Sequence, residues 1–127
     1  MTTGAPASSA SVIAQVRPWG SYMVLGRGAG YQVKRLTVSP GRRTSLQWHR
    51  HRDEHWTIVQ GECQATRGEW VFNLGLGQTI SISKAVPHRV RNPSASEALE
   101  IIEVQVGDYL EEDDIVRIED DYGRAGL

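Results

Sequence analysis

A cluster of residue types that bind metal ions stands in the middle of this 127-residue chain. Three of its four histidines, His49, His51 and His55, fall within seven residues, and Glu54 lies among them. Gln47 precedes them, and side chains at positions 47, 49 and 51 of an extended strand point to one face. Imidazole nitrogens, an amide oxygen and a carboxylate that converge in this way suit one first-row divalent ion. The segment therefore predicts a metal site rather than a set of unrelated surface histidines.

The fourth histidine, His88, follows a Val-Pro turn much later in the chain. Because it begins a short extended run of its own, we expect a second strand to bring it to the same metal. His55 directly follows Glu54, so its side chain points to the opposite face of the strand and packs or faces outward.

Short alternating runs separated by turn residues must position these side chains. The chain has 13 glycines and five prolines, and no segment shows an apolar period of 3.6 over a dozen residues. Segment 109–117 alone suggests one short helix or a turn. The pattern predicts an all-β sandwich or barrel of a single domain, with strands at 31–38, 44–51, 56–59, 62–66, 69–72, 78–83, 88–91 and 99–106.

The length and the charge limit the classes of function. A chain of 127 residues fits one domain, and a net charge of −1 argues against a nucleic-acid or anionic-membrane partner. No apolar run is long enough to span a membrane, and the small, polar N-terminus is no secretory signal. The single cysteine, Cys63, excludes an intramolecular disulfide and suits a cytoplasmic location. We expect residues 1–16 to be a loosely ordered leader and residues 17–127 to be the domain.

An acidic segment near the end of the chain has two interpretations. Eight Asp or Glu and one base, Arg117, lie between positions 108 and 121. These acids form a solvated surface, or some of them orient Arg117 or Arg124 near a site.

The spacing around the histidine cluster resembles the first motif of the cupins, in which Gly, His-x-His, Glu and Gly recur at fixed intervals. The residues that fit are Gly41, Gln47, His49, Glu54 and Gly61, with Gln47 in the place of the first histidine. The alternative, His49-x-His51, fits the intervals less well.

The second cupin motif ends in His, three residues and Asn, which His88 and Asn92 match. Ser83 and Ala85 stand where cupins carry Pro and Gly, so the turn before His88 departs from the motif.

Longer blocks are similar to the type II mannose-6-phosphate isomerase domain. They cover residues 17–22, 31–35, 46–56, 88–93, 102–117 and 121–124, which is almost the whole chain. In many members of that family the domain follows a nucleotidyltransferase that makes GDP-mannose. We expect the isomerase-type cupin here as a stand-alone domain.

This resemblance implies a double-stranded β-helix, the cupin jelly roll, that binds one divalent ion. Zinc is the expected metal, with Mn, Co, Ni or Fe as alternatives. The implied ligands are Gln47, His49, Glu54 and His88, with His51 as the alternative to Gln47. The resemblance also implies a homodimer, with a strand at 22–25 that crosses to the other subunit.

The implied activity is the metal-dependent interconversion of mannose 6-phosphate and fructose 6-phosphate in polysaccharide biosynthesis. His51, Glu103 and Arg117 are the expected catalytic residues. The expected phosphate-binding cations are Lys34, Arg89, Arg117 and Arg124. Two alternatives remain: a non-catalytic metal cupin that binds a sugar or a small acid, and a cupin dioxygenase, which a glutamine ligand disfavours.

Overall fold

The computed structural model describes residues 13–125, and every regular element among them is a β-strand. Among these residues there is accordingly no helix that could cross a membrane. The predicted all-β class is confirmed. The eleven strands are β1 (Gln15–Arg17), β2 (Gly20–Gly28), β3 (Tyr31–Val38), β4 (Leu46–Trp48), β5 (Arg52–Gln60), β6 (Cys63–Arg67), β7 (Trp70–Leu74), β8 (Thr79–Ile82), β9 (His88–Arg91), β10 (Leu99–Gly107) and β11 (Val116–Glu119).

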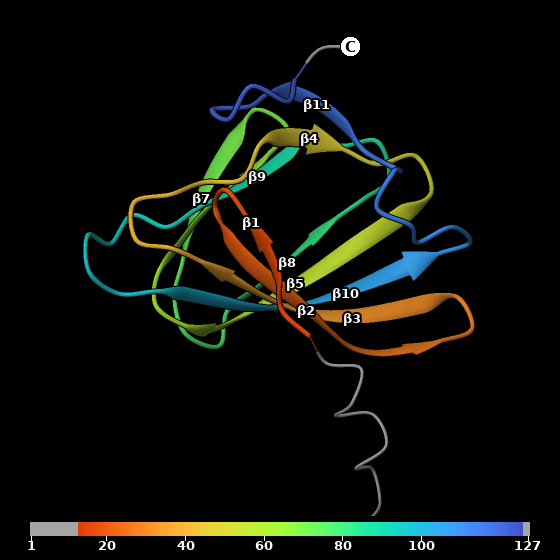
Figure 1. Ribbon diagram of the computed structural model, residues 1–127, viewed down its shortest axis with the longest axis horizontal. Helices are drawn as coiled ribbons and strands as arrows, with labels where there is room; N and C mark the ends of the chain where they lie inside the picture. The colour runs from red at the N-terminus through yellow and green to blue at the C-terminus, as the bar shows by residue number, and fades with distance from the viewer. Residues whose placement is uncertain (1–12, 126–127) are drawn as a thin grey trace, which may run out of the picture.

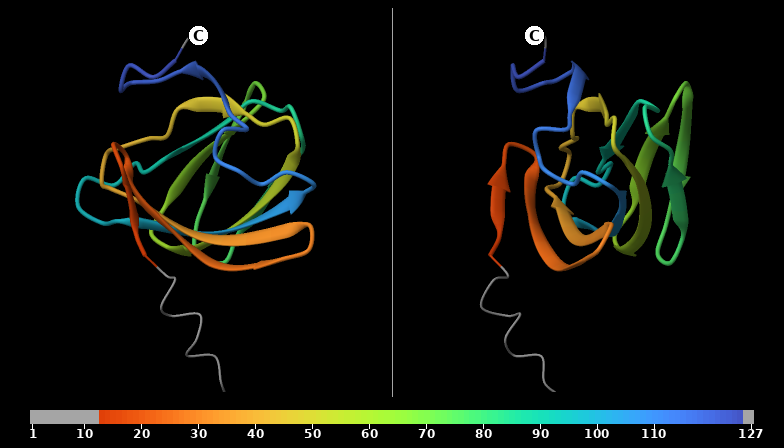
Figure 2. Two further views of the ribbon diagram at one scale, coloured as in Figure 1. Left: turned by 45° about the vertical axis from the view of Figure 1, so that its right-hand side comes forward. Right: turned by 90° about the vertical axis from the view of Figure 1, so that its right-hand side faces the viewer.

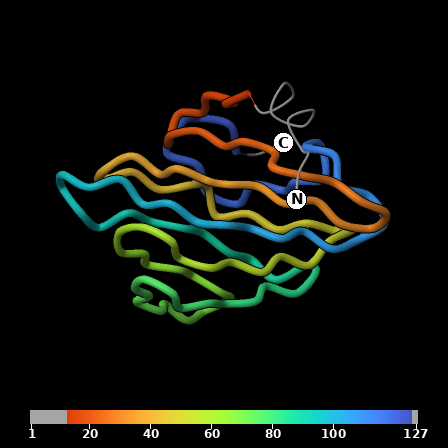
Figure 3. The backbone as a smooth tube through the Cα atoms, turned by 90° about the horizontal axis from the view of Figure 1, so that it is seen from below, coloured from red at the N-terminus to blue at the C-terminus, as the bar shows by residue number. Residues whose placement is uncertain are grey.

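The strands form two antiparallel sheets that face each other and enclose the interior of a barrel (Figures 1 and 2). One sheet has the order β1-β2-β3-β10-β5-β8 and the other the order β11-β4-β9-β6-β7. Figure 3 shows strands of the first sheet running side by side across one face of the molecule. Neighbours distant in sequence, such as β3 and β10, make this a jelly roll and agree with the predicted double-stranded β-helix.

Strand β10 lies between β3 and β5, and the register stacks their inward side chains in layers. Two layers are apolar, because Leu36, Ile101 and Ile58 share one and Val38 and Leu99 share the next. The two layers toward the other end of the same strands are mostly polar: Gln32, Gln105 and Glu54, then Lys34, Glu103 and Trp56.

The two glycines that fit the first cupin motif occupy backbone positions that other residues disfavour. Gly41 has φ of 73° in the turn after β3, and Gly61 has φ of 82° in the turn after β5. A Cβ at Gly61 would also lie 2.8 Å from the carbonyl oxygen of Ala98. Both turns therefore require glycine, and they set the ends of the strands that carry Gln47 and Glu54.

Ala85 is the one described non-glycine residue with a positive φ, at 65°. It stands where cupins carry glycine, so the turn keeps the left-handed conformation at a cost of about 1–2 kcal/mol. Its backbone N–H donates to the carbonyl oxygen of His49 at 2.8 Å, which ties this turn to the end of β4.

Several predicted boundaries differ from the structure. The predicted run over 44–51 is a strand only at β4, because the chain turns after Trp48. Segment 109–117, predicted as a short helix or a turn, contains the turn, at residues 112–113. Gln15 and Val16 of the predicted leader pair with β2, while residues 1–12 lie outside the described residues. The strand predicted to cross to another subunit, β2, lies between β1 and β3 of its own chain.

Candidate metal centre and cavity

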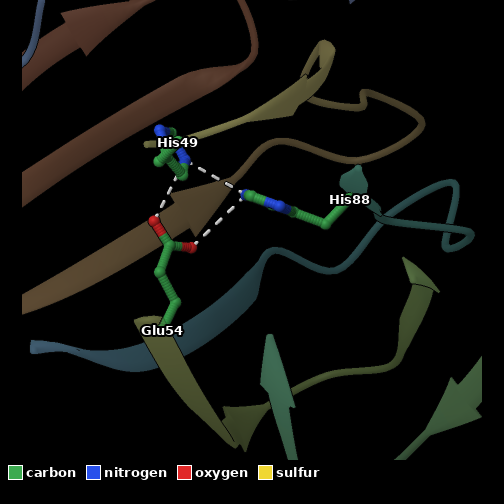
Figure 4. Close-up of side chains that lie close together, drawn as sticks. All are labelled: His49, Glu54 and His88. Atoms are coloured by element: carbon green, nitrogen blue, oxygen red, sulfur yellow. Dashed lines mark hydrogen bonds and ion pairs between the residues drawn. The ribbon is translucent and has the colours of Figure 1, made fainter. Parts of the chain in front are cut away.

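Three buried side chains from different parts of the chain meet inside the barrel: His49, Glu54 and His88 (Figure 4). His49 directly follows β4, Glu54 lies on β5, and His88 begins β9. The Nε2 atoms of the two histidines are 3.2 Å apart. Glu54 Oε2 lies 3.2 Å from His49 Nε2, and Glu54 Oε1 lies 3.5 Å from His88 Nε2. Each residue is at most 3% exposed.

These separations fit the ligands of a single ion. Neighbouring ligand atoms at about 2.0–2.2 Å from one metal are about 2.8–3.6 Å from each other across octahedral and tetrahedral geometries. All three separations fall within this range. The donor set of two imidazoles and one carboxylate suits Zn and the neighbouring first-row divalent metals.

Hydrogen bonds fix both imidazoles in the form that binds a metal. His49 Nδ1 donates to the carbonyl oxygen of Asp114 at 2.6 Å, and His88 Nδ1 donates to that of Val86 at 2.9 Å. Since a carbonyl oxygen can only accept, the proton of each neutral ring is on Nδ1 and the lone pair is on Nε2, inside the cluster.

The charges of the cluster agree with this assignment. Burial lowers the pKa of His88, so its imidazole is neutral at neutral pH. Burial alone would raise the pKa of Glu54, but His88, His49 and Arg52 together hold it well below its ordinary value. Glu54 is therefore a carboxylate and His88 a neutral imidazole, which are the states in which these two residues bind a metal.

Gln47 lies beside the cluster. It is the register partner of His88 across β4 and β9, and its Nε2 is 3.5 Å from His49 Nε2. Its Oε1 accepts a hydrogen bond from the Ser45 hydroxyl at 2.5 Å. A half-turn of the amide would bring Oε1 toward the cluster, and the hydroxyl could then accept instead of donate. The residue is therefore placed to serve as the fourth ligand.

The other predicted candidate for that place, His51, lies outside the cluster, with its side chain 48% exposed. The strand alternation that would point it inward stops at Trp48. The backbone N–H groups of Arg50 and His51 donate to the carboxylate of buried Asp114 at 2.9 and 3.0 Å. Although burial opposes the charge, these two donors lower the pKa of Asp114. The carboxylate thus stabilises the turn that directs His51 outward.

The structure also brings into the cluster a cation that the sequence interpretation missed. Arg52 is 5% exposed; its Nε donates to Glu54 Oε2 at 2.9 Å, and its Nη2 lies 3.3 Å from His49 Nε2. Its Nη1 is buried and has no hydrogen-bond partner among the described residues. A metal and Nη2 cannot both take the lone pair of His49, so metal binding must displace Nη2.

Glu54 and His88 of the cluster line a cavity together with Gln47, and its empty space is about 610 Å³ when the open mouth is counted. The excess of positive charge suits an anionic ligand. Five cations and three carboxylates line the cavity: Arg17, Lys34, Arg52, Arg117 and Arg124 against Glu54, Glu103 and Glu112.

Glu103 is the titratable group that faces this cavity beside the metal cluster. Its Oε1 accepts a hydrogen bond from Trp56 Nε1 at 3.1 Å, and its Oε2 accepts one from Gln105 Nε2 at 2.5 Å. Trp56 Nε1 also donates to Glu54, at 3.1 Å. Burial, and then the negative charge of Glu54, raises the pKa of Glu103 to about 7. A carboxyl with this pKa can take up and release a proton at neutral pH.

The predicted phosphate-binding cations do not all reach the cavity. Lys34, Arg117 and Arg124 line it, and Lys34 is ion-paired with Glu112. Arg89 is not among the lining residues; its Nε donates to the carbonyl oxygen of Thr44 at 2.9 Å, and its Nη1 donates to Glu119 at 3.2 Å. On the outer face of the barrel, exposed His55 is hydrogen-bonded to Ser81 at 2.8 Å.

Comparison with known proteins extends over nearly the whole chain. Residues 8–120 match the family model described as "Mannose-6-phosphate isomerase C-terminal". The xanthan biosynthesis protein XanB of Xanthomonas campestris is 54% identical over 109 residues, and a mannose-1-phosphate guanylyltransferase of Escherichia coli is 46% identical over the same length. These matches cover 86% of this chain but only 23% of each relative.

Solved structures resemble the chain in fold. Oxalate decarboxylase from Bacillus subtilis has a TM-score of 0.75 at 16% identity, over 87% of this chain and 31% of that one. A cupin from Shewanella frigidimarina has a TM-score of 0.71 at 17% identity, over 82% and 89% of the two chains. The cupin fold predicted from the sequence is confirmed.

Proposed function

The chain belongs to the mannose-6-phosphate isomerase C-terminal family, and we propose that it is a metal-dependent isomerase that interconverts mannose 6-phosphate and fructose 6-phosphate. The names of two relatives, a xanthan biosynthesis protein and a mannose-1-phosphate guanylyltransferase, support a role in supplying mannose for polysaccharides. The chain spans less than a quarter of the length of these relatives, so the isomerase activity is proposed for this domain alone. The proposal includes the cytoplasmic location and the homodimer that the resemblance implies.

One observation carries the proposal. A cluster fit for a metal and a buried carboxyl with a pKa of about 7 face one cavity that has an excess of positive charge. An aldose-ketose isomerase needs a group that stabilises a negatively charged oxygen, a group that moves a proton, and cations that hold the phosphate.

The reaction moves a proton between two neighbouring carbons of an open-chain sugar. In the aldose, C1 is an aldehyde and C2 carries a hydroxyl; in the ketose, C2 is the ketone and C1 carries the hydroxyl. A bound divalent ion, proposed to be zinc, supplies positive charge that stabilises the enediolate formed between them. His49, Glu54 and His88 would hold it, with Gln47 as the fourth ligand.

Glu103 is the proposed proton carrier. As a carboxylate it accepts the proton from C2, and as a carboxylic acid it returns the proton to C1, while the proton of the C2 hydroxyl passes to the oxygen on C1. The reverse reaction uses the same states in the opposite order. The donors Trp56 and Gln105 hold its two oxygens in place. Of the other expected catalytic residues, Arg117 is proposed to bind the phosphate, and we assign no step to His51, which is half-exposed outside the cluster.

A coupled assay of fructose 6-phosphate formation tests the proposal. We expect turnover of mannose 6-phosphate that is lost on chelation, restored by Zn, Mn or Co, and absent in His49→Ala together with the bound metal. His55→Ala is the matched control, because His55 is an exposed histidine on the outer face of the barrel. If the wild-type protein binds one metal ion but turns over nothing, the proposal is wrong and the domain is a non-catalytic, metal-containing cupin.

A further inference from the structure

Asp114 is the one buried residue of segment 108–115, which joins β10 to β11. Its carbonyl oxygen accepts a hydrogen bond from the imidazole of His49, and its carboxylate accepts two more from the backbone that follows His49. We infer that Asp114 is a positioning residue for the metal ligand His49, and that it couples metal binding to the order of segment 108–115. This inference rests on the metal site of the proposed function and is independent of the substrate.

The backbone around His49 is held from outside its own strand. His49 directly follows β4, which has three residues, and the chain turns before β5 begins at Arg52. The N–H groups of Arg50 and His51 in this turn donate to the two carboxylate oxygens of Asp114, at 2.9 and 3.0 Å. The carboxylate therefore supplies the acceptors that a neighbouring strand would otherwise supply.

The imidazole of His49 is oriented by the same residue. Its Nδ1 donates to the backbone oxygen of Asp114 at 2.6 Å, and this leaves Nε2 directed at Glu54 and His88. A partner on the nitrogen that does not bind the metal fixes the orientation and the tautomer of a ligating histidine. Asp114 thus holds His49 at two points, through the ring and through the backbone that follows it.

Segment 108–115 begins and ends against this one turn. Gly107, the last residue of β10, is the register partner of Arg52, with which β5 begins. Asp114, near the other end of the segment, returns to the turn through its bonds to Arg50 and His51. The position of the segment and the position of His49 are therefore set by the same contacts.

The segment also forms part of the cavity wall. Glu112 and Ile115 line the cavity, and Glu112 is ion-paired with Lys34 of β3. Displacement of the segment would remove these two side chains from the wall and the hydrogen-bond partner from His49 at the same time. Because such coupling is reciprocal, a metal ion that holds His49 in place should also stabilise segment 108–115.

Metal affinity tests the positioning role without turnover. Asp114→Ala removes the carboxylate, and we expect it to bind Zn about 10- to 100-fold more weakly than the wild type in competition with a zinc-binding dye. Asp114→Asn keeps one acceptor oxygen, so its affinity should lie between the two. Asp113→Ala is the matched control, because it removes a carboxylate from the neighbouring exposed residue, which is hydrogen-bonded to Tyr109. Its affinity should equal that of the wild type.

The gain in stability on metal binding separates positioning from a structural role. A structural role alone would lower the free energy of unfolding equally with and without Zn. A positioning role also reduces the gain that a fixed concentration of Zn provides, by about 1.4 kcal/mol for each tenfold loss of affinity. Urea unfolding of Asp114→Ala, Asp114→Asn and the wild type, each with and without Zn, measures this gain.

Hydrogen exchange tests the coupling. In the wild type and in Asp113→Ala, adding Zn should slow the exchange of the amides of Arg50 and His51 and of those in segment 108–115. In Asp114→Ala the segment should exchange at the same rate with and without Zn. Exchange of the wild-type segment that Zn leaves unchanged would refute the coupling.

The failures of the two proposals give different results. Wild-type affinity and an unchanged gain in stability in folded Asp114→Ala would refute the positioning role, and Asp114→Asn provides the same test if the alanine variant does not fold. Metal binding that depends on Asp114, in a protein without turnover, would refute the isomerase and leave the positioning role standing. A wild type that binds no divalent ion would refute both.

Discussion

The two ends of the barrel interior are built on the same three strands and have opposite chemistry. At one end of β3, β10 and β5, the inward side chains are Leu36, Ile101 and Ile58, none more than 8% exposed. One layer further along the same strands, the inward side chains are Lys34, Glu103 and Trp56. Between these two layers the backbone pairing of the three strands continues without a register shift. The difference between the two ends therefore lies in the side chains alone. Burial of the apolar side chains stabilises the fold, and this stability offsets the cost of burying charged side chains at the polar end.

This division predicts that single substitutions at the two ends have separable effects. Changes at the polar end should alter activity and metal binding with little loss of stability. Changes at the apolar end should reduce the free energy of unfolding and leave the metal cluster intact.

The largest expected effect is at the polar end. Replacing Glu103 by Gln removes the proposed proton carrier and keeps the size of the side chain, so kcat should fall about 100- to 10,000-fold. In the wild type, kcat/KM should rise with pH through about 7 as Glu103 loses its proton. Steady-state assays between pH 5.5 and 9 measure both. Glu100→Gln is the control, because Glu100 lies on the outward side of the same strand; equal losses in the two variants would contradict a catalytic role.

The stability of Glu103→Gln should change in the opposite direction to its activity. The pKa of Glu103 is raised from the ordinary 4.5 to about 7 in the folded protein, so the folded state binds the proton more tightly. The contribution of Glu103 to the free energy of unfolding is therefore fully present below about pH 4.5 and is lost as the pH rises through about 7. Above pH 7 the metal-free Glu103→Gln variant should gain about 1–3 kcal/mol relative to the wild type in urea unfolding. A less stable variant at pH 8 would show that the carboxylate is not strained.

The next largest effect belongs to the apolar end. Ile101→Ala should lower the free energy of unfolding by about 2–5 kcal/mol, because Ile101 is fully buried between Leu36 and Ile58. Urea unfolding followed by circular dichroism measures the loss, and the metal content per chain should stay that of the wild type. Ile102→Ala removes the same atoms from the outer face of β10 and should cost much less. Loss of the bound metal in folded Ile101→Ala would show that the two ends are coupled.

The smallest effect concerns the turn that precedes His88. Ala85→Gly should raise the free energy of unfolding by up to about 1 kcal/mol, because glycine adopts the left-handed conformation without the strain of a Cβ. Lys84→Gly, one residue earlier, should destabilise the protein instead, since Lys84 does not have a positive φ. Thermal unfolding of both variants makes the comparison, and a lower midpoint for Ala85→Gly would contradict it.

The sequence was sufficient to predict the fold class and three residues that the structure brings together, His49, Glu54 and His88. Motif spacing and strand alternation depend only on residues close together in sequence, and both correctly predicted that Glu54 on β5 points into the barrel. Alternation was misleading at His51, because the turn that ends β4 is stabilised by Asp114, which is more than 60 residues away in sequence.

Two further cations of the cavity illustrate the same limit. Arg52 could have been found, since it lies two residues before Glu54 and so shares its face of the strand. No local pattern could have identified Arg17, because its position beside Arg117 depends on how β1 and β11 pack at the ends of two different sheets. Contacts between elements distant in sequence, rather than residue type, therefore decide which arginines line the cavity and which lie on the surface.

Trp56 lies at the boundary between the two ends, 2% exposed, with its indole N–H shared by Glu54 and Glu103 and its ring centroid 5.7 Å from that of His88. An indole excited by light moves electron density within its ring, so its emission responds to charges nearby. A proton on Glu103 or a cation held by Glu54 changes the field at this ring directly. We therefore expect the emission of Trp56, one of four tryptophans in the chain, to change when Glu103 binds a proton or Glu54 holds a cation.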